Sequence, residues 1–453
     1  MLFVKILQAI KQINKEEIIM NKFFEWMEEH FVPVAAKIGG QRHLVAIRDG
    51  FATITPLIMA GAFAVLFNNL GFEWYQNLLN SIMPFGWKAW GGNVWTASFG
   101  IMAILVSFTV SYHLARSYNK DGLAAGILGA AASICLYATT PDGALPFTFL
   151  GAQGLFISLI VAIVSTELFV KLIGNPRLVV KMPEGVPPAV TKSFAALIPS
   201  IIVLAIAAGV KQLFITISIT DMHQVLFITI QRPLQGLVGS LGGVLLLVFI
   251  MQLLWFFGLH GSNILDPIIK ALLLPLVLAN TEAIQNGLQP ENILSSQFID
   301  TYVNMGGSGA TLALIAAIFI LGKKSGKQQK VIANLGVGPG CFNINEPIIY
   351  GMPIVLNPMY FIPFLLAPLV SVVIAYVLTY IGFVPKVSIL ATWTTPPILS
   401  GLLTTNSIMG SVTALICFAS SVLIYLPFVY LVGKQEVTNE KATLEENLQS
   451  EQC

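Results

Sequence analysis

Long stretches without a charged residue constrain the fold of this sequence more than any other feature. Two of them, Pro347–Pro385 and Val387–Gly433, exceed one membrane crossing, so each must hold a helix and a further segment. Five more match the roughly 17 to 25 residues with which a helix crosses the hydrocarbon of a bilayer. These five runs are Gly50–Gly71, Gly143–Thr166, Ser193–Val210, Pro233–Leu259 and Tyr302–Gly322. The pattern predicts an all-α polytopic membrane protein.

The composition agrees with this prediction. Charged residues make up 10% of the 453 residues and apolar residues 56%, whereas soluble domains carry roughly 25% charged residues. Of the 46 charges, 13 fall in residues 1–49 and 7 in residues 434–453. So few charges cannot cover the surface of soluble domains, which excludes a soluble globular protein. The net charge of +2 identifies no partner.

The basic residues predict the orientation, because Lys and Arg are retained on the cytoplasmic side. Groups at 37–48, 116–120, 171–192 and 323–330 indicate inside loops, whereas residues 71–91 carry one Lys. Alternating sides gives ten crossings with both termini in the cytoplasm. We expect them near residues 50–70, 92–113, 122–140, 150–171, 194–216, 236–258, 264–281, 309–322, 359–383 and 408–432.

The two halves of the hydrophobic region differ in character. In the first half small residues abound, as in the G-x-x-x-G spacing of Gly122 and Gly126. This spacing fits a dimer or scaffold surface, and equally ordinary packing between helices of one chain. From Gly236 onward the hydrophobic sequence is interrupted by Gly, Pro, Asn and single ionisable residues. Irregular backbone in a bilayer needs protein or water around it, so we place the working site in the second half.

Two breaks carry the functional prediction. The first, Trp255–Asn263, contains His260, which ends an uncharged run and shares a helix face with Gln252 and Phe256. The second, Pro339–Pro347, contains Glu346 in an otherwise uncharged stretch, and the following proline disfavours helix there.

A carboxylate at membrane depth costs about 2.5–3.5 kcal/mol, so Glu346 is expected to face a cavity, to pair, or to be protonated. The alternative for Glu346 is a structural ion pair or a helix-end cap facing the cytosol. The alternative for His260 is a packing or interfacial histidine. We predict that both residues act at the working site, because both stand at helix breaks.

The breaks also supply groups that suit a neutral polyol, which needs hydrogen-bonding groups and flat apolar faces. The two tryptophans have an alternative as part of the aromatic belt at the membrane interface. The scarcity of Arg and Lys in this half argues against a strongly anionic substrate. The substrate-binding candidates are Asn345, Asn343, Trp255, Asn263, Trp393 and Ser308.

Other chemistries lack their motifs. The four cysteines are scattered, the remaining histidines show no metal-ligand spacing, and no phosphate-binding loop or nucleophile elbow is present. Basic residues have no nucleic-acid-binding arrangement. We therefore expect no metal, no cofactor and no nucleic-acid partner.

The sequence resembles a known family at these breaks. Phe257-Gly258-Leu259-His260-Gly261 and Asn345-Glu346-Pro347, followed by Tyr350-Gly351-Met352-Pro353, look like the motifs of the membrane-embedded IIC component of bacterial sugar phosphotransferase systems. The likeness is to the lactose/cellobiose/diacetylchitobiose group and spans about residues 21–433.

The resemblance implies a homodimer with ten spanning helices and two re-entrant hairpins in the bacterial plasma membrane. It divides the chain into a cytoplasmic amphipathic segment (1–49), a scaffold and dimerisation half (50–220), a substrate-binding half (221–433) and a polar cytoplasmic tail (434–453). A sugar taken from outside would receive phosphate on a primary hydroxyl from a phosphocysteine of a separate soluble IIB protein, itself served by IIA. Glu346 matches the carboxylate near that hydroxyl, and His260 matches its partner.

Two rivals stay open. An ion-coupled secondary sugar transporter would use Glu346 as proton carrier without phosphorylation, and a membrane glycosyltransferase is disfavoured because no D-x-D pair is present. The sequence leaves open which sugar binds.

Overall fold

The computed structural model describes residues 25–69, 73–83, 86–140, 142–183, 185–352 and 354–450. Within these ranges the ordered elements are all helical and no strand occurs, which confirms the predicted all-α class. Residues 1–24 of the predicted amphipathic segment (1–49) lie outside the described residues, and so does Pro353 of the family-like motif.

Helices occur near all ten predicted crossings, but not all ten are long enough to span a bilayer. Among the described residues, eight helices or continuous helix pairs are long and apolar enough to cross a bilayer, a bent pair can supply a ninth crossing, and α7 (Gly122–Leu136) is a shorter apolar helix. The eight are Arg42–Val65, Lys88–Ser117, Ala152–Ile173, Pro188–Thr216, Gly261–Gln285, Ser308–Ser325, Pro358–Tyr380 and Ile408–Lys434.

Two crossings differ in detail from the prediction. The sixth is not one straight helix over 236–258, because Met222–Val238 and Leu241–Phe256 meet at 67°. Ser240 restarts the helix at this bend by accepting a hydrogen bond from the N–H of Gly243. The third ends at Leu136 rather than near 140, because Tyr137 adopts an extended backbone.

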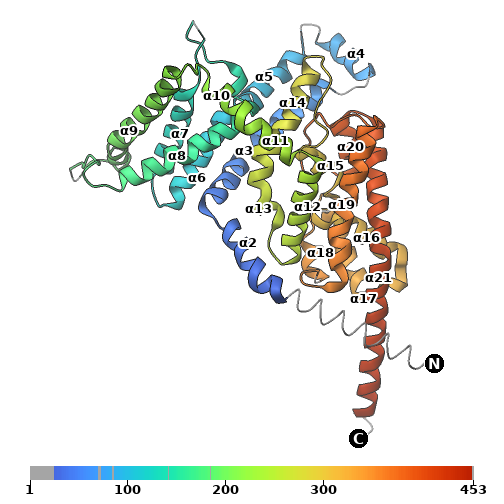
Figure 1. Ribbon diagram of the computed structural model, residues 1–453. Coiled ribbons are helices and arrows are strands. Elements are labelled where there is room, and N and C mark those ends of the chain that lie inside the picture. The colour runs from blue at the N-terminus through green and yellow to red at the C-terminus, as the bar shows by residue number, and fades with distance from the viewer. Residues whose placement is uncertain are drawn as a thin grey trace.

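Helices α3 and α5 to α9 of the first half lie together, drawn in blue to green in Figure 1, whereas α4 is drawn apart from them, near α14 (Leu274–Gln285). Helix α6 packs against α3, α7 and α8, and α9 packs against α7 and α8. The bounds are α2 Val32–Gly39, α3 Arg42–Asn69, α4 Glu73–Ile82, α5 Lys88–Ser98, α6 Met102–Ser117, α8 Leu155–Ile173 and α9 Pro188–Thr216.

Small residues bring α6 and α7 into close contact. The Ser107 hydroxyl donates to the carbonyl of Gly129 (2.9 Å). A Cβ at Gly126 would lie 3.0 Å from the Phe108 carbonyl oxygen, and one at Gly129 would collide with the Ser111 hydroxyl. The small-residue face of α7 thus serves packing within the chain, the second of the two alternatives for the G-x-x-x-G spacing.

Replacing Gly129 by valine is expected to destabilise the protein by about 1–3 kcal/mol, because the added methyl groups have no space between α6 and α7. Gly209→Val in α9 is the matched control, since a Cβ at Gly209 meets nothing within 4 Å. Thermal unfolding in detergent measures both. Equal midpoints for the two variants would contradict this account of the helix contact.

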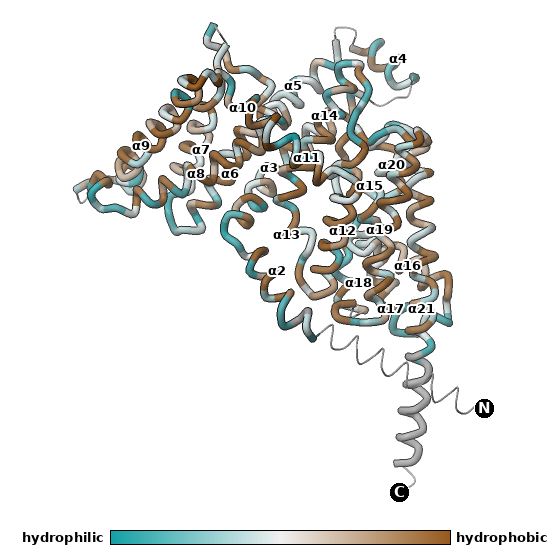
Figure 2. Tube along the Cα trace, in the orientation of Figure 1, coloured by the Kyte–Doolittle hydropathy of each residue, from teal (hydrophilic) through white to brown (hydrophobic). Residues whose placement is uncertain are grey.

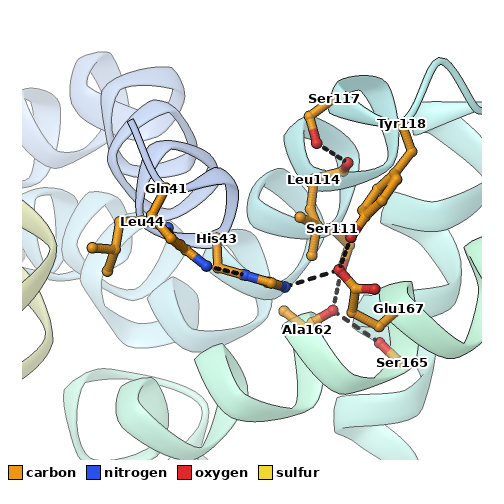
Figure 3. Close-up of polar contacts among 10 residues, drawn as sticks. All are labelled: Gln41, His43, Leu44, Ser111, Leu114, Ser117, Tyr118, Ala162, Ser165 and Glu167. Carbon is orange, nitrogen blue, oxygen red and sulfur yellow. Dashed lines mark hydrogen bonds and ion pairs between the residues drawn. The ribbon is translucent and has the colours of Figure 1, made fainter. Parts of the chain in front are cut away.

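A polar cluster joins the start of α3 to α8 and to the end of α6 (Figure 3). The His43 ring accepts at Nδ1 from Gln41 and donates through Nε2 to Glu167 of α8 (2.8 Å). The Tyr118 hydroxyl donates to the same carboxylate oxygen (2.6 Å). The Arg42 guanidinium lies 3.9 Å from the centre of the Tyr118 ring. Helix α3 is therefore anchored to α6 and α8.

The second half contains the discontinuous helices, with hydrophobic residues along the helices and hydrophilic ones gathered in the connections (Figure 2). Helix α21 packs against α16, α19 and α20. The bounds are α10 Met222–Leu226, α11 Arg232–Val238, α12 Leu241–Phe256, α13 Gly261–Ile268, α14 Leu274–Gln285, α15 Ser296–Tyr302, α16 Thr311–Leu321, α17 Lys327–Cys341, α18 Glu346–Gly351, α19 Pro358–Tyr380, α20 Pro397–Thr405 and α21 Ile408–Ser450.

Two short helices of this half, α15 and α20, pack against each other. The Thr301 hydroxyl donates to Thr404 (3.2 Å), and Ser400 donates to Thr301 (3.3 Å). Both helices are too short to cross a bilayer. They fit the two re-entrant segments that the family resemblance implies.

Candidate functional site

A cavity of about 950 Å³ lies between α3 and the broken helices of the second half. Its wall on one side is a face of α3 that includes Phe51 and Thr55. The structure brings all eight residues predicted for the site into the lining of this one cavity. They are His260, Glu346, Asn343, Asn345, Trp255, Asn263, Trp393 and Ser308.

The histidine and the glutamate face each other across the two breaks. His260 Nδ1 accepts from the N–H of Asn263 (3.2 Å) and so caps the start of α13. This hydrogen bond places the ring proton on Nε2, which lies 3.9 Å from Glu346 Oε1. That separation is longer than a direct hydrogen bond, and the side chains are 40% and 47% exposed. Both groups can therefore contact the same polar ligand atom.

Helix α18 begins at the carboxylate. Pro347 occupies the first turn, where its missing N–H costs no helical hydrogen bond. Glu346 itself is the first residue of this helix. Local sequence thus positions the carboxylate at a helix start inside the cavity.

Trp255 supports the histidine from behind. The two rings are 4.2 Å apart between centroids, and Trp255 is only 2% exposed. Its Nε1 donates to Ser262 (3.2 Å), whose hydroxyl contacts that of Ser308 (2.9 Å). Asn345 donates to the Ser308 carbonyl (2.8 Å). These contacts order the imidazole, and the burial of Trp255 excludes a place in an interfacial aromatic belt.

Asn343 joins three segments of the cavity wall. Its side-chain nitrogen donates to the carbonyls of Trp393 and Thr395, and its Oδ1 accepts from the N–H of Gly306 (2.8 Å). Its backbone φ of +63° is one that Asn tolerates better than most residues. Both side-chain N–H groups are therefore used to hold loops. Trp393, by contrast, is 55% exposed at the cavity wall.

Sequence reasoning missed several ionisable and polar residues that line the same cavity. Asp266 and Lys270 form an ion pair (4.0 Å) within one helical turn, and Gln297 accepts from the N–H of Ala391 (3.1 Å). The signal that could have found them is a single ionisable residue inside an apolar helix. The missed residues are Arg48, Asp266, Lys270, Gln297 and Asp300.

A second cavity, of about 940 Å³, lies among α4, α14, α19 and α20. Its lining includes Glu73, Lys88, Gln289 and Lys386, and it contains none of the residues predicted for the site. The facing histidine and glutamate therefore single out the first cavity.

The crossings, the discontinuous helices and the polar cavity between the two halves define a polytopic membrane transporter. Residues 48–368 match the family described as phosphotransferase system, EIIC. The chain belongs to this family.

Similar proteins agree across almost the whole chain. The lichenan permease IIC component of Bacillus subtilis (strain 168) is 40% identical over 93% of this chain and 96% of its own length. The cellobiose-specific EIIC component of Geobacillus stearothermophilus is 38% identical over 93% of this chain and 97% of its own. The crystal structure of the transporter ChbC, the IIC component of an N,N'-diacetylchitobiose-specific system, matches with a TM-score of 0.88 and 36% identity, covering 92% and 99% of the two chains.

Proposed function

We propose that the chain binds a β-linked disaccharide of the cellobiose, diacetylchitobiose or lactose type in the cavity at His260 and Glu346. It presents a primary hydroxyl of this sugar to a phosphocysteine on a separate soluble IIB protein. The observation that carries the proposal is the 3.9 Å approach of these two side chains inside a cavity of about 950 Å³. The names of the relatives support the sugar class.

Glu346 acts on the hydroxyl that becomes phosphorylated. Its carboxylate accepts the hydroxyl proton while the oxygen attacks phosphorus, the P–S bond breaks and the thiolate of IIB leaves. His260 donates from Nε2 to the carboxylate or to the hydroxyl oxygen and so orients the pair. Phosphoryl transfer is mostly positioning and charge stabilisation, which fits a site with few reactive groups.

The remaining predicted residues hold the sugar or shape its site. Trp393 offers an exposed ring on which a pyranose face can stack. Asn345 and Asn263 offer amide groups at the break, together with the hydroxyl of Ser308. Asn343 does not contact the sugar directly. It shapes the site, because its amide donates a hydrogen bond to the carbonyl of Trp393 and so holds this residue in place.

Transport follows from movement between the two halves. Residues 50–220 form a scaffold, which is also the dimerisation side, and residues 221–433 carry the sugar past it between outward and inward states. The cavity lies between α3 and the second half, and α3 is anchored to α6 and α8, which supports this division. Both termini face the cytoplasm, with residues 434–453 as a polar tail, and the homodimer sits in a lipid bilayer.

Vesicle uptake tests the proposal. Purified protein reconstituted in lipid vesicles is expected to accumulate labelled disaccharide phosphate only with phosphorylated IIB and IIA, and an ionophore should leave the rate unchanged. Uptake that collapses with the ionophore and ignores IIB would instead establish an ion-coupled transporter. Direct binding of glucose, cellobiose, lactose and diacetylchitobiose to the same preparation identifies the sugar.

A further inference from the structure

We propose that Arg48 stabilises the phosphoryl group while it passes from IIB to the sugar. The inference rests on the proposed function of the His260–Glu346 site. It adds a residue of the first half of the chain to a reaction whose other groups all come from the second half.

Arg48 belongs to α3 and lines the same cavity as the histidine and the glutamate. The lining of this cavity also includes the Asp266 carboxylate. The Arg48 side chain is 37% exposed. It therefore combines a place in the wall of the cavity with an accessible charge.

The guanidinium has hydrogen-bond donors to spare. Arg48 donates from Nε to Asp49 Oδ1 (2.9 Å), and its Nη2 lies 2.8 Å from the same oxygen as an ion pair. An arginine carries five N–H groups, so these two contacts fix the plane of the fork and leave the N–H groups of Nη1 for a ligand. Asp49 is outside the cavity lining, so the carboxylate that orients the fork does not fill the cavity.

Lys270, the other cation among the described lining residues apart from the histidine, is placed differently. Its Nζ lies 4.0 Å from Asp266, a carboxylate that itself lines the cavity. Its charge is thus offset inside the cavity, whereas that of Arg48 is offset from outside. Arg48 is the better placed of the two to receive an anion.

The proposed transfer needs such a cation. The cavity wall already carries the carboxylates of Glu346, Asp266 and Asp300, and a phosphoryl group brings about two further negative charges. Like charges this close repel strongly in a site of low dielectric. A planar guanidinium matches two phosphoryl oxygens at once and is the residue type that offsets this charge in other phosphoryl transfers.

Arg48 exchanges no bond in this step. The sulfur–phosphorus bond of the phosphocysteine breaks, the bond between phosphorus and the sugar oxygen forms, and the hydroxyl proton passes to Glu346. The IIB thiolate takes the bonding electron pair. Arg48 only donates N–H hydrogen bonds to non-bridging phosphoryl oxygens, most strongly when charge spreads over them.

Arg48→Gln and Arg48→Lys test the assignment with two readouts. We measure disaccharide affinity by titration and the maximal transfer rate at saturating phosphorylated IIB. Arg48→Gln is expected to keep the affinity within about twofold and to lower the maximal rate by about 10²–10³-fold, the usual effect of removing one charge-stabilising donor. Arg48→Lys should recover part of the rate, because it restores the charge without the fork.

Arg42→Gln is the matched control, since Arg42 lies on the same helix, stacks on Tyr118 and is absent from the cavity lining. It should keep the maximal rate. A wild-type maximal rate for Arg48→Gln would overturn the proposal. An effect only on the half-saturating IIB concentration would also overturn it, because Arg48 would then serve the docking of IIB. A parallel loss of sugar affinity would do the same, because Arg48 would then be a sugar-binding residue.

Glu346→Gln in the same assay keeps the two hypotheses apart. If wild-type protein transfers no phosphate, or if Glu346→Gln is fully active, the proposed function fails. If those two behave as proposed and Arg48→Gln is fully active, only the role of Arg48 fails.

Discussion

Glu346→Gln is expected to lower phosphoryl transfer to the bound sugar by about 10²–10⁴-fold, the usual contribution of a positioned general base. Glutamine keeps the shape and can still accept a hydrogen bond, but it cannot take the hydroxyl proton. Disaccharide affinity should therefore change by no more than about threefold. Single-turnover transfer from phosphorylated IIB, with sugar titration in parallel, measures both quantities.

Glu282→Gln is the matched control for this substitution. Glu282 is an exposed carboxylate of α14 that lies outside both cavities, so its loss should leave transfer unchanged. Wild-type transfer by Glu346→Gln with normal sugar binding would remove the carboxylate from the mechanism. An equal loss of affinity and rate would make Glu346 a sugar-binding residue only.

Asn343→Ala is expected to destabilise the protein by about 2–5 kcal/mol, because three hydrogen bonds are lost and their backbone partners near the cavity stay unsatisfied. Sugar affinity should fall as well, by about tenfold or more, since Trp393 is no longer held at the wall. Thermal unfolding and disaccharide titration check the two effects.

Two further variants separate hydrogen bonding from backbone strain at this position. Asn343→Gly adopts the φ of +63° freely but also lacks the amide, so it should lose stability like alanine. Asn119→Ala places alanine at a similar φ of +57° outside the cavity and measures strain alone. If Asn343→Gly kept wild-type stability and affinity, the hydrogen bonds of Asn343 would not hold the site together.

The local breaks could be predicted because their causes are local. His260 ends an uncharged run, and a proline follows Glu346, so each residue stands where a helix stops or starts in the structure. The bend at Ser240 was missed, although serine is one of the residues that favour the N-cap of a helix. Hydropathy alone does not reveal such a bend, because the residues on both sides of it are equally apolar.

The roles of individual residues in the wall could not be predicted. Trp255 and Trp393 looked alike in the sequence, yet one is buried behind the imidazole and the other is exposed. Asn343 looked like a sugar ligand, yet its amide donors are taken by two carbonyls. Arg48 appeared only as part of a basic flank, although it lines the cavity.

The lipid environment, the helical class, the approximate crossings and the two breaks could all be predicted from the order of the residues. Burial in lipid and the backbone limits of proline act on neighbouring residues, so their effects appear in the local sequence. The 3.9 Å approach of His260 to Glu346, and the place of α3 in the wall of their cavity, follow from the packing of distant segments. Side chains from distant segments set the rotation of each helix and the depth of each break. Hydrophobic periodicity does not identify which segments pack against each other.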